Sequence, residues 1–131
     1  AGNLWIAIYQ KGVMMIPAQP NSFKYIGYKS INKNIIGSNC ITSLCRDHKG
    51  ILWIGTDNDG IYGITTELKQ KVHYAPHDSP SSVPSTVFGL YEDSERNLWF
   101  GSYTNGLGRL DKKTGQCSYL QNLTDKNGNC I

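Results

Sequence analysis

Residues 3–12 (NLWIAIYQKG), 51–60 (ILWIGTDNDG) and 97–106 (NLWFGSYTNG) repeat one pattern, an apolar run around a tryptophan that ends in a glycine. The tryptophans are 48 and 46 residues apart: Trp5, Trp53 and Trp99. A glycine follows each tryptophan after seven residues: Gly12, Gly60 and Gly106. A fixed period of about 40 to 50 residues is typical of stacked β modules. The spacing therefore predicts a repeat protein.

Each repeat has the pattern of four short strands separated by turns. In the middle repeat we expect strands over residues 41–46, 52–56, 61–65 and 71–75, which leaves almost no room for a helix. Asp47 and Gly50 suit the first and last places of a tight turn, and in the third repeat Asn97 is expected to supply the left-handed conformation. The sequence thus predicts an all-β fold of four-stranded antiparallel meanders, the blades of a β-propeller.

The blade boundaries follow from the repeat. We expect a partial blade without its first strand over residues 1–40, complete blades over 41–86 and 87–128, and the start of a further blade at 129–131. A closed propeller has about four to eight blades, so these roughly 2.75 blades predict a fragment that packs against the remaining blades of a longer protein. Unpaired blade faces also predict self-association of the fragment.

Composition argues against several functional classes. Only 18% of residues are charged, 39% are hydrophobic and 14 are glycine, which is typical of a turn-rich β protein and not of a disordered chain. The 13 basic residues are scattered without a run, so nucleic acid is not an expected partner. We also expect no membrane contact by this segment, because no apolar run reaches about 20 residues and no signal peptide is recognisable. The pairing of the four cysteines stays open: Cys40, Cys45, Cys117 and Cys130.

Residues 41–61 resemble the two-component regulator propeller repeat, through the pattern Ile-x-x-Leu-x-x-Asp-x-x-Gly-Ile-Leu-Trp-Ile-Gly-Thr-x-x-x-Gly-Ile. The pattern recurs more loosely over residues 87–107, and its second half over residues 4–13. This family occurs in the sensor regions of hybrid histidine kinases. The resemblance implies a periplasmic, non-catalytic module that senses an oligosaccharide derived from a glycan. A protein-interaction propeller and a propeller polysaccharide lyase remain as alternatives.

Candidate ligand-binding residues lie where the repeats differ. In an antiparallel meander the turns between second and third strands share one edge with the blade-to-blade connections, and these segments vary while their surroundings repeat. Tyrosine rings can stack on sugars, and amides and carboxylates can pair with hydroxyls. The residues expected to contribute to this ligand face are Tyr9, Asp57, Asn58, Tyr103, Asn105, His77 and Asp78.

We expect the residues that recur in the repeats to stabilise the blades and not to bind a ligand. A binding site rarely needs the same residue in every repeat, so the tryptophans are expected to pack between blades. Asp47 and Asp93 each stand six residues before a tryptophan, where a carboxylate can accept hydrogen bonds from turn N–H groups. The proposed blade signature comprises Trp5, Trp53, Trp99, Gly12, Gly60, Gly106, Asp47 and Asp93. We expect no catalytic residues, no cofactor and no metal site, since no histidine stands at metal-ligand spacing from the cysteines.

Overall fold

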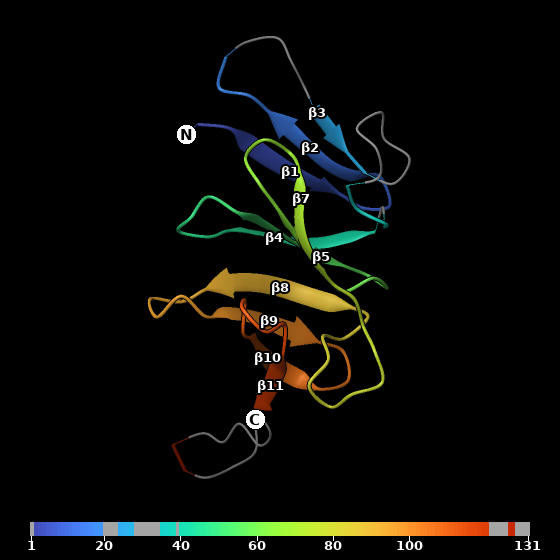
Figure 1. Ribbon diagram of the computed structural model, residues 1–131, viewed down its shortest axis with the longest axis vertical. Helices are drawn as coiled ribbons and strands as arrows, with labels where there is room; N and C mark the ends of the chain where they lie inside the picture. The colour runs from blue at the N-terminus through green and yellow to red at the C-terminus, as the bar shows by residue number, and fades with distance from the viewer. Residues whose placement is uncertain (1, 20–23, 28–34, 39, 121–125, 128–131) are drawn as a thin grey trace.

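The structure is a computed structural model that describes residues 2–19, 24–27, 35–38, 40–120 and 126–127. Within these residues the chain forms strands and no helix, arranged as three antiparallel sheets stacked along the long axis of the molecule (Figure 1). The predicted all-β fold of propeller blades is confirmed. The described part of the chain accordingly contains no helix that could span a membrane.

The three sheets are meanders in which consecutive strands pair. We call them blade 1, blade 2 and blade 3. Blade 1 consists of β1 (Leu4–Ile8), β2 (Gly12–Ile16) and β3 (Lys24–Ile26). Blade 2 consists of β4 (Ile41–Arg46), β5 (Leu52–Thr56), β6 (Ile61–Ile64) and β7 (Gln70–Tyr74). Blade 3 consists of β8 (Val87–Glu92), β9 (Leu98–Ser102), β10 (Gly106–Leu110) and β11 (Cys117–Leu120). The strands of blade 2 lie within one residue of the predicted bounds, whereas residues 129–131, the predicted start of a further blade, lie outside the described residues.

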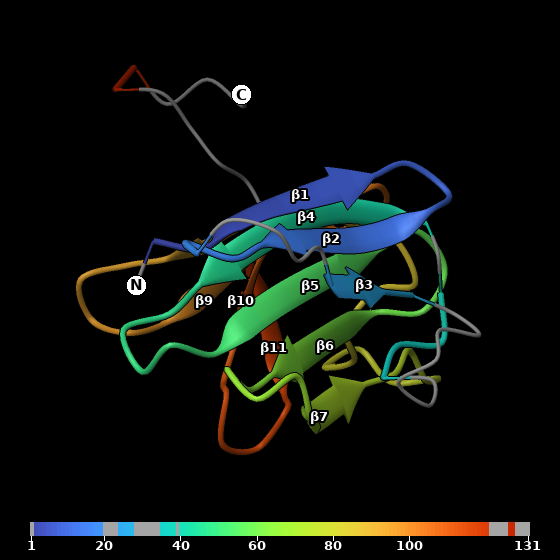
Figure 2. The same cartoon turned by 90° about the horizontal axis from the view of Figure 1, so that it is seen from above.

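The meander gives the blades two loop edges (Figure 2). We call one the connection edge, since it carries the β1–β2, β5–β6 and β9–β10 turns together with the link from β7 to β8. The opposite one, the hairpin edge, carries the β4–β5, β6–β7, β8–β9 and β10–β11 turns. Every loop of a given type therefore emerges at the same end of the stacked sheets, as the sequence predicted for the connection edge.

The hydrophobic core lies between the blades. Successive side chains of a strand point to opposite faces of its sheet. In β5, Leu52 and Ile54 join the cluster shared with blade 1, while Trp53 joins the cluster shared with blade 3. In the second cluster Phe100 is only 1% exposed and packs with Leu98 from the same strand. A single blade therefore has no core of its own, and each stabilises its neighbour.

Backbone geometry explains two of the repeated glycines and corrects one expectation. Gly60 has a φ of 73°, and a Cβ there would lie 2.2 Å from the carbonyl oxygen of Tyr74. Gly12 has a φ of 98° and faces a similarly close backbone oxygen. The expectation that Asn97 takes a left-handed conformation is wrong, because the positive φ of that turn, 71°, falls on Arg96. Asn97 instead donates its backbone N–H and its side-chain N–H to Asp93.

Candidate functional site

A carboxylate fixes the first hairpin of both complete blades. Trp53 Nε1 donates to Asp47 Oδ2 at 2.9 Å, and Asp47 Oδ1 accepts the backbone N–H groups of Lys49 and Ile51, each at 2.9 Å. In blade 3, Trp99 Nε1 donates to Asp93 Oδ2 at 2.6 Å. The six-residue spacing thus sets the carboxylate against the indole N–H of the same hairpin. Both aspartates therefore hold their own turn together.

These contacts lower the pKa of both carboxyl groups. Hydrogen bonds from Trp99 and then Asn97 lower the pKa of Asp93 to about 2. Burial on its own would raise the pKa of Asp47, but the hydrogen bonds from Trp53 and Ile51 outweigh it and lower the pKa below the ordinary value. Both groups are therefore carboxylates at neutral pH.

The three repeated tryptophans take equivalent positions but differ in how well they are covered. Trp53 is 4% exposed and packs against blade 3, and Trp5 packs against the cluster between blades 1 and 2. Trp99 lies on the face of blade 3 that points away from blade 2, with the Arg109 guanidinium 6.0 Å from its ring centroid. This placement makes all three tryptophans part of the blade faces.

The expected ligand face contains a small groove between blades 2 and 3 at the connection edge. It has a volume of about 300 Å³. The lining residues are Asp57, Pro84, Ser85, Thr86, Phe88, Tyr103 and Thr104. Two of the seven predicted ligand-binding residues, Asp57 and Tyr103, therefore meet there from different blades.

The other five predicted ligand-binding residues lie at the connection edge but outside the lining of this groove. Tyr9 is exposed on the β1–β2 turn, and His77 and Asp78 are exposed in the link from β7 to β8. Asn58 Oδ1 accepts a hydrogen bond from Ser38 Oγ at 3.2 Å, and Asn105 donates its backbone N–H to Ser102 Oγ at 2.8 Å. The structure therefore supports one edge for these residues, with only two of them sharing a hollow.

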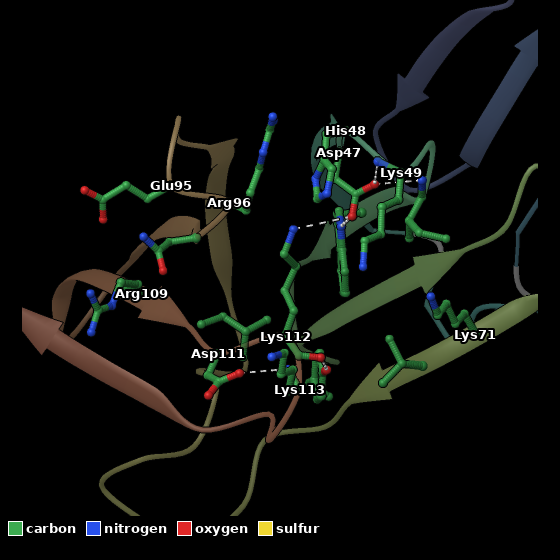
Figure 3. A pocket seen from close by; sticks show the side chains of 16 residues that line it. Asp47, His48, Lys49, Lys71, Glu95, Arg96, Arg109, Asp111, Lys112 and Lys113 are labelled. Carbon is green, nitrogen blue, oxygen red and sulfur yellow. Dashed lines mark hydrogen bonds and ion pairs between the residues drawn. The ribbon is translucent and has the colours of Figure 1, made fainter.

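A larger cleft opens between blades 2 and 3 at the opposite, hairpin edge (Figure 3). Its volume is about 850 Å³. Six of its lining side chains are cationic: Lys49, Lys71, Arg96, Arg109, Lys112 and Lys113. Three are carboxylates: Asp47, Glu95 and Asp111. Sequence reasoning missed this cleft, because its basic residues come from separate turns and strands of two blades.

An ion-pair network joins the two blades inside the cleft. Lys112 Nζ lies 2.8 Å from Glu92 Oε2 and 3.4 Å from Asp47 Oδ2, and His48 Nδ1 lies 2.7 Å from Glu92 Oε1. Asp47 and His48 belong to the β4–β5 turn of blade 2, whereas Glu92 and Lys112 belong to blade 3. Burial on its own would raise the pKa of Glu92, but the hydrogen bonds from Lys112 and His48 lower it below the ordinary value. The network therefore fixes how blade 2 sits on blade 3.

The same residues form the one group of metal-ligating side chains within the described part of the chain. Ligand atoms of Asp47, His48 and Glu92 lie within 4.8 Å of one another. The ammonium of Lys112 contacts both carboxylates, so their charge is already balanced by a side chain of the protein. Their geometry is that of an inter-blade ion-pair network.

The described cysteines carry free thiols. Cys40, Cys45 and Cys117 form no disulfide, and Cys130 lies outside the described residues. Burial raises the pKa of Cys117 to about 12, and it is also the largest effect in raising the pKa of Cys45. Both thiols are therefore protonated at neutral pH, and neither has the thiolate character of a nucleophile.

Comparison with known proteins agrees with this architecture. No curated protein matches the sequence. An extracellular domain described as part of the hybrid two component system BT3049 from B. thetaiotaomicron is similar at 19% identity and a TM-score of 0.75, over 98% of this chain and 19% of that chain. The extracellular domain of BT4673, described as a one component system from the same organism, is similar at 20% identity and a TM-score of 0.70, over 96% of this chain and 19% of that chain.

The chain thus spans about a fifth of the length of these solved structures, with which it shares the fold. Residues 35–58 and 81–104 match the model of the two component regulator propeller. Each matched segment contains the first two strands of a complete blade, including its tryptophan and the carboxylate that binds it. The two matched segments are therefore similar to repeats of the two component regulator propeller.

Proposed function

We propose that this chain is an extracytoplasmic, non-catalytic sensor segment of a hybrid two-component signalling protein, and that it binds an oligosaccharide at the connection edge. The family repeats support the sensor role, and the similar solved structures, which are extracellular domains of two-component systems, support the location. The observation that carries the binding site is the groove in which Asp57 of blade 2 meets Tyr103 of blade 3.

The chemistry of this groove suits a sugar. Tyr103 is 85% exposed, so its ring can stack on the apolar face of a pyranose, and the half-exposed Phe88 adds apolar surface beside it. Thr86 Oγ1 donates to Asp57 Oδ1 at 2.8 Å, which orients the carboxylate. Within the described residues Asp57 Oδ2 has no hydrogen-bond partner, and it is the acceptor that we assign to a sugar hydroxyl. The remaining predicted residues extend the contact surface along the same edge: Tyr9, Asn58, Asn105, His77 and Asp78.

Because the groove lies between two blades, ligand binding there can change how the blades are arranged. A ligand shifts an equilibrium only when it binds one arrangement of the receptor better than another. Because Asp57 and Tyr103 stand on different blades, a ligand that contacts both favours one relative position of blade 2 and blade 3. We infer that this preference is what the rest of the signalling protein detects.

Calorimetric titration of a panel of neutral oligosaccharides tests the proposal. For the oligosaccharide that binds, Tyr103→Ala and Asp57→Ala should each weaken the affinity by about tenfold, a loss of about 1.4 kcal/mol. The matched control is Tyr91→Ala, because Tyr91 is also a well-exposed tyrosine of blade 3 (66%) but lies outside the groove. Unchanged affinity in both groove variants would refute the site, and turnover of the sugar would favour an enzyme.

We also propose that further blades of the parent protein pack on the outer faces of blades 1 and 3, and that the isolated chain self-associates through them. Leu4 on blade 1 and Tyr91 on blade 3 expose large apolar side chains. Exposed apolar sheet faces of this kind favour association. Light scattering should show a mass that rises with concentration, and a monomer at high concentration would contradict the proposal.

A further inference from the structure

The hairpin-edge cleft gathers nearly half of the basic side chains of the protein. Six of the 13 lysines and arginines line it, although they are dispersed along the sequence. Lys49 and Lys71 come from blade 2, and the other four come from blade 3. Figure 3 shows side chains of both blades around the same hollow, with Lys112 running through its centre toward Asp47.

Several of these cations have no carboxylate at ion-pair distance within the described residues. Lys112 and Arg96 have Glu92 as an ion-pair partner. Lys49, Lys71 and Lys113, in contrast, have no ion-pair partner within the described residues. The carboxylates of the lining are also partly engaged by backbone groups, since Asp111 Oδ1 accepts the N–H of Lys113 at 2.8 Å. With six cationic side chains against three carboxylates, the lining carries a net positive charge.

A cleft lined by an excess of one charge concentrates its electric field and attracts ligands of the opposite sign. The volume of about 850 Å³ is large for a single inorganic anion, and it lies within the range of about 300 to 1,000 Å³ typical of sites for organic ligands. The unpaired lysines also lie on both walls, with Lys71 on blade 2 and Lys113 on blade 3. An elongated ligand with several anionic groups can contact both walls at once.

The lining favours a saccharide over other polyanions. Carboxylates such as Glu95 stand among the cations, so the cleft presents acceptors as well as an excess of donors. Sugar hydroxyls use both, whereas ionised phosphates only accept. Single-stranded nucleic acid gains its affinity from stacking on exposed rings, but Trp53 is 4% exposed and Tyr74 donates its hydroxyl to the carbonyl oxygen of Lys112.

We propose that the hairpin-edge cleft is a second binding site, separate from the connection-edge groove, and that it takes an acidic oligosaccharide with carboxylate or sulfate groups. Lys71 and Lys113 bind the anionic groups from opposite walls, and Lys49 adds a third cation at the β4–β5 turn. The network of Lys112, Glu92 and Asp47 holds the two walls at a fixed separation.

Calorimetric titration with three probes of matched length tests the proposal: an oligogalacturonate, a sulfated dextran oligosaccharide and neutral dextran. The first two arms separate carboxylate from sulfate recognition. At least one acidic saccharide should bind, and neutral dextran should not. The double variant Lys71→Gln/Lys113→Gln should lower the affinity for the acidic saccharide by about tenfold or more, and added salt should lower this affinity further. These side chains are exposed and have no ion-pair partner in the described residues, so the variant should keep its fold.

The matched control is Lys11→Gln/Lys69→Gln, which removes two lysines that are also exposed but lie outside the cleft. An equal loss of affinity in this control would overturn the proposal, because attraction would then depend on net charge alone. Tighter binding of poly-glutamate or single-stranded DNA than of either acidic saccharide would overturn the ligand class. Tyr103→Ala should leave acidic binding unchanged, which separates this site from the connection-edge groove.

Discussion

Replacing Asp47 with alanine should destabilise the protein by about 3 kcal/mol. The carboxylate accepts the buried N–H groups of Trp53 and Ile51, each at 2.9 Å, and both donors would lose their partner. An unsatisfied buried donor costs about 1 to 3 kcal/mol. Lys112 would keep Glu92 as its partner, so it adds little to the loss. The expected value therefore comes mainly from the two buried donors.

Asp93→Ala is the matched control, since Asp93 makes the corresponding bond to Trp99 in blade 3. Its donors are only partly buried, so water can replace the carboxylate, and we expect a smaller loss than for Asp47→Ala. Urea unfolding of the full chain, followed by tryptophan fluorescence, measures both free energies of unfolding. Equal losses in the two variants, or less than about 1 kcal/mol for Asp47→Ala, would refute the argument from burial.

Three further predictions concern the core, pH and thiols. Phe100→Ala should cost about 3 to 5 kcal/mol in urea unfolding, since Phe100 is 1% exposed between two blades; a loss below about 1 kcal/mol would contradict the inter-blade core. Folding lowers the pKa of Glu92, and that of Asp93 to about 2, so their contribution is complete above the unfolded values of about 4 and is lost as pH falls toward 2. The melting temperature should fall over that range, and a constant value would count against these contacts. A chain that keeps Cys117 as its single cysteine should react with Ellman's reagent at pH 8 only after unfolding, given a pKa of about 12.

Much of the fold could be predicted because the repeat aligns strand with strand. The predicted strand over residues 41–46 matches β4, and 52–56 matches β5, since apolar runs between turn residues have little choice of bounds. The turn of blade 3 was harder. Asn favours a left-handed conformation, which pointed to Asn97, but the carboxylate of Asp93 binds Asn97 and the positive φ falls one residue earlier, on Arg96. The hydrogen bonds from Asn97 to Asp93 therefore outweigh the left-handed preference of asparagine.

Of the two candidate sites, only the connection-edge groove could be predicted from the sequence. Meander topology places Asp57 and Tyr103 at the same edge, and this could be predicted without a structure because strand direction alone decides it. The cationic cleft could not be predicted. Lys71 and Lys113 are 42 residues apart and stand in different blades, so only the packing of blade 3 on blade 2 brings them to one hollow. A scattered charge pattern in the sequence therefore does not exclude a charged site.

The outward position of Trp99 gives the chain a natural optical reporter. Trp53 is already covered by blade 3, so its fluorescence emission maximum should be at a shorter wavelength than that of an exposed indole, and it should change little when a partner binds. Trp99 occupies the corresponding place on the uncovered face of the last described blade. Its emission wavelength, read in a chain whose other indoles are replaced, should therefore tell whether another module is seated on that face.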